Sequence, residues 1–246
     1  MIRLDNISKS FRGQKVLDGL DLTIDAEKIT VIIGRSGGGK SVLLKHLIGL
    51  IRPDSGHIYV DGQDMATLND KGLNELRKKF GMLFQDAALF DSMTVGENVA
   101  FPIREHTRLS QKDIEKIVEK KLAQVGLKNV SHKMPSELSG GMRKRVGLAR
   151  AIALNPKIIL FDEPTTGLDP VMCNAIDNLI VETQRDTKAT CVIISHDIES
   201  TFKIAHKIAM LYQGKIIELG SPDEFARSQK KVVREFIGSW KNKSIA

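Results

Sequence analysis

The chain has 246 residues and is 41% hydrophobic, which is enough for a sizeable core in one large domain or one domain with a lobe. Its net charge is +7, but Lys and Arg are scattered, which indicates a solvated basic surface. No apolar run approaches the roughly 18 residues of a spanning helix. The two cysteines, Cys173 and Cys191, lack metal-type spacing, so we expect reduced thiols in a cytosolic protein, with Cys191 in the core.

Residues 2–33 alternate between apolar and polar positions or run apolar, with turn signals between. The pattern predicts antiparallel strands that lead into a buried strand at Ile29–Ile33. Phe11 stands at the end of the first strand. It is either a core or edge aromatic or a platform for adenine, and Val16 could close the same face.

A glycine-rich loop follows the buried strand and opens a predicted helix over residues 41–50. Glycines let successive N–H groups point at phosphate oxygens, and the helix N-terminus adds its positive dipole end. Lys40 is a compact cation for the β- and γ-phosphates, and the Ser41 hydroxyl suits Mg²⁺. The simpler interpretation is a flexible turn between a core strand and a core helix. The predicted nucleotide-binding residues of the loop are Gly34, Arg35, Ser36, Gly37, Gly38, Gly39, Lys40 and Ser41.

A second apolar strand, residues 80–85, is predicted to end at Gln85. The carboxyl end of a buried parallel strand is where ligands collect in open α/β sheets. From Asp86 to Leu138 the pattern becomes helical, with capping-box spacing at Thr94 and Ser110. We therefore predict a helical lobe inserted into an α/β core.

Leu138-Ser139-Gly140-Gly141-Met142 leads into a predicted helix over residues 143–153. Ser139 is a natural N-cap, so the segment is at least a good helix start. It is also a second anion site, and it has no lysine of its own.

Residues 157–163 form an apolar run that ends in two carboxylates, which is typical of a buried parallel strand with acids at its tip. Asp162 is suited to hold Mg²⁺, and Glu163 to orient or deprotonate a water that attacks a γ-phosphate. The alternative is a polar turn before Pro164.

Asp169 and Pro170 have the pattern of an N-cap and a first helical residue. A further buried strand at residues 190–195 is followed by His196, which is either a γ-phosphate contact or a structural histidine. Strands at 205–211 and 215–219 and a helix capped by Ser221 complete the fold. The basic end, residues 230–246, either contacts a partner cassette or the membrane surface or is a disordered end.

In order and spacing these segments resemble the ATP-binding-cassette (ABC) ATPases over essentially the whole chain. The resemblance implies an α/β fold: a P-loop NTPase (RecA-like) core, an antiparallel β subdomain and an inserted helical subdomain at about residues 87–154. It makes residues 1–240 one ATP-binding domain and 241–246 a tail. The segments that carry it are the phosphate loop 34–41, Gln85 of the Q-loop, the signature 138–141, the Walker B run 158–162 with Glu163, Asp169 of the D-loop and the switch His196, with Phe11 at the adenine-stacking position.

The resemblance also implies roles for these residues. Two cassettes pair head to tail, most simply as a homodimer, with ATP and Mg²⁺ between the phosphate loop of one and the signature of the other. Closure on ATP and reopening after hydrolysis drive an integral membrane permease. The implied catalytic residues are Glu163, His196, Lys40 and Gln85; the implied metal ligands are Ser41, Gln85 and Asp162; and Ser139, Gly140 and Gly141 join the phosphate loop and Phe11 in binding ATP.

The segment 84–107, together with Ser-Gly-Gly-Met at 139–142, looks like the cassettes of MCE-type lipid transporters such as the Mla phospholipid system. That resemblance implies an ATPase subunit on the cytoplasmic face of the inner membrane, with a permease, an MCE-type protein and a lipid reached indirectly, and with no nucleic acid as partner. Met142 departs from the glutamine of many ABC members. The alternatives are a cassette for amino acids or cell division, a regulatory cassette that does not turn ATP over, and a non-transport ABC ATPase acting on the ribosome or nucleic acid.

Overall fold

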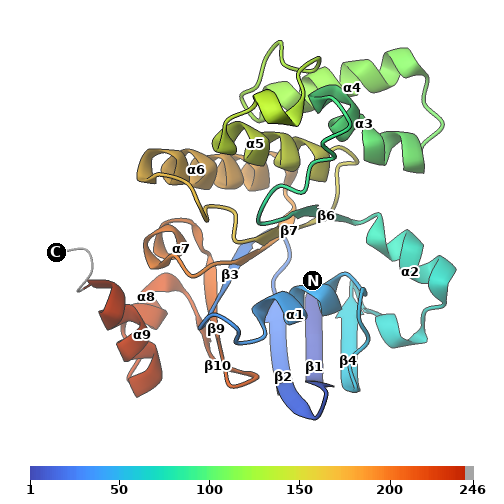
Figure 1. Cartoon of the computed structure of the whole chain (residues 1–246). Coiled ribbons are helices and arrows are strands. Elements are labelled where there is room, and N and C mark those ends of the chain that lie inside the picture. The colour runs from blue at the N-terminus through green and yellow to red at the C-terminus, as the bar shows by residue number, and fades with distance from the viewer. Residues whose placement is uncertain (242–246) are drawn as a thin grey trace. The chain divides into compact units, whose positions relative to one another are not determined.

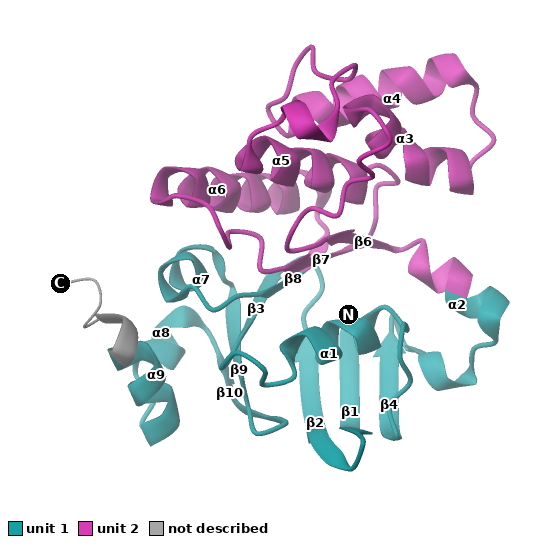
Figure 2. Cartoon of the chain, in the orientation of Figure 1, with its two compact units in different colours: residues 1–73, 192–246 teal, residues 74–191 magenta. Residues whose placement is uncertain are grey.

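The computed structural model describes residues 1–241, with side chains to residue 238. Figure 1 traces the chain, and Figure 2 colours its two compact units. Unit 1 comprises residues 1–73 and 192–246, and unit 2 comprises residues 74–191. The predicted tail, from residue 242 onward, and the side chain of Trp240 lie outside the described part of the chain.

The first sheet of unit 1 is antiparallel, as predicted, with strand order β2-β1-β4-β5. Alternating burial along β1 explains its register, in which Ile2 faces Ile24 and Leu4 faces Leu22. These four side chains are almost completely buried. The strands are β1 (Ile2–Phe11), β2 (Gln14–Ile24), β4 (Ser55–Val60) and β5 (Gln63–Asp64).

The strands of the second sheet that belong to unit 1 follow the order β10-β9-β3-β8. β3 is parallel to β9, and each of its five residues is buried, as expected of a central parallel strand. β8 contributes residues to both units. The strands are β3 (Ile29–Ile33), β8 (Thr190–Ile194), β9 (Lys207–Tyr212) and β10 (Lys215–Gly220); the helices are α1 (Lys40–Leu47), α7 (Ile198–Ile204), α8 (Pro222–Ala226), α9 (Lys231–Lys241) and the short η1 (Met65–Thr67).

Unit 2 contains the parallel strands β6 and β7 and a group of helices. The strand next to β7 in the sheet is β8. The predicted caps are present, because Thr94 forms a full capping box with Glu97 and the Ser110 hydroxyl accepts from the Asp113 N–H. The elements are β6 (Phe80–Leu83), β7 (Ile158–Asp162), α3 (Val95–His106), α4 (Gln111–Gln124), η2 (Pro135–Glu137), α5 (Gly140–Ala151) and α6 (Pro170–Thr187), while α2 (Asp70–Arg77) crosses the boundary between the units.

Several predicted boundaries were wrong. α1 ends at Leu47, before Gly49, whose φ of 66° is left-handed. β6 ends at Leu83, two residues before Gln85. Residues 231–241 form α9, so the alternative of a disordered basic end is wrong for them. Within residues 1–241, none of the helices has both the length and the hydropathy needed to cross a membrane.

Candidate functional site

The predicted phosphate loop lies between β3 and α1 in unit 1. Gly39 occupies the N-cap position of α1 with a φ of 96°, a left-handed conformation that favours glycine. A Cβ there would also lie 3.1 Å from Val16 Cγ1, which is tighter than an ordinary contact. Residues 35–37 at the tip of the loop are exposed. Gly39 provides no side-chain cap to α1, and the positive dipole end of the helix favours an anion at this loop.

Lys40 and Ser41 begin α1 and have different environments. The Lys40 side chain crosses the loop and is 7% exposed. Its Nζ donates to the Gly34 carbonyl at 2.8 Å and to the Arg35 carbonyl at 3.0 Å. Ser41 is exposed. The loop thus holds a cation inside its curve and presents a hydroxyl at the helix start, which is the chemistry that a phosphate–Mg²⁺ pair requires.

Phe11 and His196 also belong to unit 1. Phe11 is 44% exposed, so its interpretation as a core aromatic is wrong. The Lys9 ammonium lies 5.6 Å from the centroid of its ring, which gives the ring one cationic neighbour. His196 is exposed and follows β8, and the next residue, Asp197, caps α7 through the Ser200 N–H.

The two acids predicted for metal binding and water activation lie at the end of β7 in unit 2. Asp162 is the last residue of the strand, and Glu163 follows it with a left-handed φ of 50°. That conformation costs a non-glycine residue roughly 1–3 kcal/mol and is concentrated at functional sites. The Thr166 hydroxyl donates to Glu163 Oε2 at 3.1 Å and so fixes the orientation of the carboxylate.

Gln85 lies in the exposed turn after β6, also in unit 2. Its carbonyl accepts a hydrogen bond from Lys144 Nζ on α5. Burial lowers the pKa of Lys144, while the charges of Asp86, Glu163 and Asp162 partly offset that effect. Lys144 is not predicted from the sequence, where its one signal is a lysine on the buried face of a predicted helix.

Ser139 caps α5, as predicted, and its hydroxyl accepts from the Met142 N–H at 3.3 Å. The helix begins three residues earlier than expected, at Gly140, so Gly140 and Gly141 form its first turn. Beside this turn is a cavity of about 190 Å³, and its lining includes Asp86, Gly140 and Gly167. Asp169 caps α6 through the Met172 N–H. The turn is a helix N-terminus, whose positive dipole end favours an anion.

The structure therefore groups the predicted residues by unit. Phe11, the phosphate loop 34–41 and His196 belong to unit 1, whereas Gln85, Ser139–Gly141, Asp162 and Glu163 belong to unit 2. Within residues 1–241 there is no cluster of three or more His, Cys, Asp or Glu side chains arranged for a metal. The predicted donors of Ser41, Gln85 and Asp162 are oxygens, which fit Mg²⁺, an ion that commonly completes its coordination with substrate phosphates and water.

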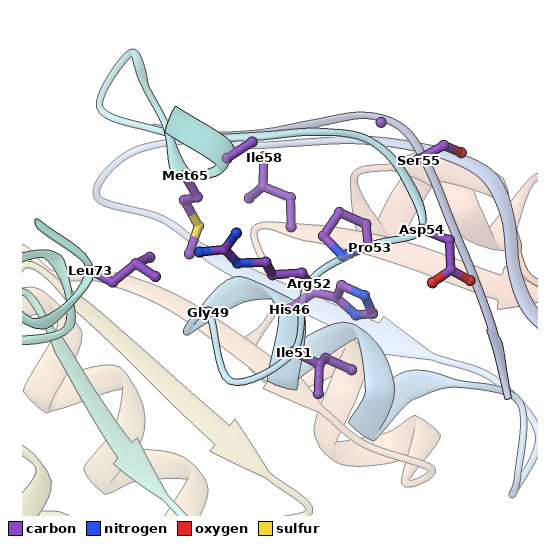
Figure 3. Close-up of a pocket in the computed structure, with 12 residues that line it drawn as sticks. His46, Gly49, Ile51, Arg52, Pro53, Asp54, Ser55, Ile58, Met65 and Leu73 are labelled. Carbon is purple, nitrogen blue, oxygen red and sulfur yellow. The ribbon is translucent and has the colours of Figure 1, made fainter. Parts of the chain in front are cut away.

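A cavity of about 160 Å³ in unit 1 is separate from these residues. Figure 3 shows His46, Arg52 and Met65 among its lining residues. His46 is completely buried, and its Nδ1 pairs with the Val42 carbonyl at 2.8 Å. Burial lowers the pKa of His46 and favours the neutral ring. None of the predicted site residues lines this cavity.

A glycine-rich loop that opens a helix after a buried strand, with paired carboxylates at the tip of another strand, defines a phosphate-loop nucleotide-binding protein of the α/β class. The chain belongs to the ABC transporter family, whose model matches residues 17–166. This confirms the family predicted from the motifs.

The curated relatives carry two kinds of name. The chain is 44% identical over 236 residues to the "probable ribonucleotide transport ATP-binding protein mkl" of Mycobacterium tuberculosis, covering 96% of this chain but only 66% of that protein. It is 45% identical over 227 residues to the "intermembrane phospholipid transport system ATP-binding protein MlaF" of Haemophilus influenzae, covering 92% of this chain and 86% of that protein. The Escherichia coli K12 protein of the same name is 40% identical over 237 residues, with coverages of 96% and 88%.

Solved structures agree with this fold. A dimeric, post-hydrolysis structure of the ATP-binding cassette MJ0796 with ADP and Pi matches with a TM-score of 0.83 and 31% identity, covering 90% of this chain and 99% of that chain. CbiO1 of Clostridium perfringens, part of the transporter complex cbiONQ, matches with a TM-score of 0.85 and 32% identity, covering 95% and 93%. The predicted α/β cassette fold is therefore confirmed.

Proposed function

We propose that this chain is the ATP-hydrolysing subunit of an ABC transporter that moves phospholipid through a separate membrane permease. The observation that carries the ATPase part is the pair of glycine-containing helix starts in one chain. The loop before α1 holds Lys40, whereas the turn before α5 presents Ser139 and has no lysine in its glycine turn. Two copies arranged head to tail supply both halves to each ATP. Relatives named for phospholipid transport, at 40–45% identity, support the substrate class.

Each predicted residue has a role in this proposal. The loop 34–41 wraps the phosphates, Lys40 neutralises them, and Phe11 stacks on adenine. Ser139–Gly141 of the opposite cassette closes on the γ-phosphate. Glu163 activates the attacking water, and His196 contacts the γ-phosphate. Residues 1–240 form one ATP-binding domain with a helical subdomain at about 87–154 and a tail at 241–246.

We assign the Mg²⁺ ligands to the Ser41 hydroxyl, the Gln85 side-chain oxygen and the Asp162 carboxylate. When bound, Mg²⁺ neutralises phosphate charge and orients the γ-phosphate. The protein residues do the remaining work. Thr166 orients Glu163, and the open N-terminus of α1 holds the phosphates while the water is deprotonated.

A groove on unit 2 suits the permease. It has a volume of about 450 Å³, and its lining includes both aromatic rings and basic groups. Phe84 is 40% and Phe90 42% exposed, and the rings of Phe90 and Phe101 lie 4.9 Å apart. An amphipathic permease helix with acidic flanks matches both features. This partner places the chain on the cytoplasmic face of the inner membrane, and an MCE-type protein would join through the permease.

The first test is a mild-detergent pull-down of the full chain from its own membranes, with mass spectrometry of proteins and lipids. We expect a permease, an MCE-type protein and phospholipid. Phe90→Asp should lose the permease, whereas Leu109→Asp, at a residue that is 45% exposed and outside the groove, should keep it. A co-purifying permease that carries no lipid and takes up nucleotides would contradict the lipid assignment. Ribosomes or nucleic acid in place of a permease would contradict the transporter proposal.

A further inference from the structure

The loop that carries Gln85 is attached to α5 by two side chains, those of Lys144 and Arg150. Lys144 Nζ donates to the Gln85 carbonyl. Arg150 donates through Nη2 to the Ala87 carbonyl at 2.6 Å and through Nη1 to the Ala88 carbonyl at 2.7 Å. Lys144 and Arg150 are six residues apart on α5, and together they bind three carbonyls of the loop.

Gly147 lies between these two cations in the sequence of α5. A Cβ at this position would lie 2.8 Å from Leu83 Cδ1 and 3.1 Å from Ala87 Cβ. The loop therefore packs directly on the helix backbone where no side chain intervenes. The close approach brings the loop carbonyls within reach of Lys144 and Arg150, whose bonds are charge-assisted and hence stronger than neutral ones.

The loop needs such support because its backbone is strained. Ala87 and Ala88 have φ values of 60° and 46°, and neither residue is a glycine. Two consecutive left-handed residues with side chains are unfavourable unless the surroundings hold them. The Ala87 N–H donates to the Phe84 carbonyl at 2.9 Å, which closes the turn but leaves the three carbonyls for α5.

We propose that Lys144 and Arg150 are positioning residues that hold the loop 84–88 in its strained conformation on α5. Because Ser139 caps the same helix, Gln85 and the Ser139–Gly141 turn then move as one body. Any displacement of the signature turn is carried to Gln85 without a change in the loop. The inference rests on the proposed function only for its catalytic consequence, since the attachment itself is a property of unit 2.

Hydrogen exchange at the Ala87 amide tests the attachment without requiring activity, because this amide is bonded inside the turn. Lys144→Met and Arg150→Met in the full chain should each raise the exchange rate about tenfold, the effect of removing a charge-assisted hydrogen bond. Arg145→Met is the matched control, because Arg145 also lies on α5 but donates to the Val125 carbonyl, at 2.8 Å. The proposal is overturned if the Ala87 amide exchanges at the same rate in the unsubstituted chain and in all three variants, Lys144→Met, Arg150→Met and Arg145→Met.

Steady-state kinetics tests the catalytic consequence. Lys144→Met should lower kcat for MgATP about tenfold and change KM less than twofold, since the phosphate loop is untouched. Lys144→Arg, which keeps a cationic donor, should recover most of kcat and restore slow exchange at Ala87, and Arg145→Met should leave both unchanged. An equal loss of kcat in the Lys144→Met and Arg145→Met variants contradicts a specific positioning role. Gln85→Ala with normal turnover would refute the role of Gln85, while the exchange result would still decide the attachment.

Discussion

Asn98 offers a direct test of how unit 2 is held together. This side chain is completely buried at the start of α3. The two hydrogens of its Nδ2 are shared among the carbonyls of Phe90, Met93 and Thr94, at 3.0–3.1 Å, and its Oδ1 accepts from the Phe90 N–H at 2.8 Å. One amide group therefore fixes both ends of the segment 90–94, which includes Phe90 of the groove.

Asn98→Ala removes all of these bonds and leaves the main-chain groups of a segment that is exposed at 90–92 and half-buried at 93–94 without the side-chain partner. At about 1 kcal/mol net for each of two donor bonds and one acceptor bond, the free energy of unfolding should fall by roughly 3 kcal/mol. With an m-value of about 2 kcal/mol/M, the urea midpoint should fall by roughly 1.5 M.

The assay is urea unfolding of the full chain followed by circular dichroism. Asn74→Ala is the matched control, because Asn74 is exposed and accepts a single bond, from Arg77 Nη1 at 2.9 Å. It should cost less than about 0.5 kcal/mol. A loss below about 1 kcal/mol for Asn98→Ala would refute the reasoning, because it would mean that water replaces the amide at little cost.

Glu163→Gln should keep ATP binding and lower kcat about 100-fold or more in an ATPase assay; unchanged turnover would remove Glu163 from catalysis. Lys40→Met should weaken MgATP binding roughly 10- to 100-fold by titration calorimetry, through loss of charge-assisted bonds, and unaltered affinity would contradict its role. Ser139→Arg should abolish the ATP-dependent dimer in gel filtration while monomers still bind ATP, whereas Ser110→Arg, which also removes a helix cap, should dimerise normally. Burial raises the pKa of Cys191 to about 12, so at pH 8 native protein should be alkylated only at Cys173, and rapid labelling of Cys191 would show that its strand opens.

The sequence by itself determined the local elements of this protein. The glycine loop before α1, the caps at Thr94, Ser139 and Asp169, and the five buried residues of β3 all follow from neighbouring residue types. Turn geometry, capping and periodicity act over a few residues, so one sequence suffices to recognise them. The same locality explains why the family and the α/β class could be predicted. The helix α9 was not predicted, because that segment was interpreted from its charge alone.

Only the tertiary structure decided which side chains meet across the sequence. Lys144 reaches a carbonyl 59 residues away, and Arg150 reaches carbonyls 62 and 63 residues away. Nothing in the local pattern marks these partners, since the same cations could equally face solvent. The left-handed conformations of Ala87 and Glu163 likewise go against their own preferences. Such positions depend on packing between distant elements, and that packing alone sets the orientation of the candidate catalytic groups.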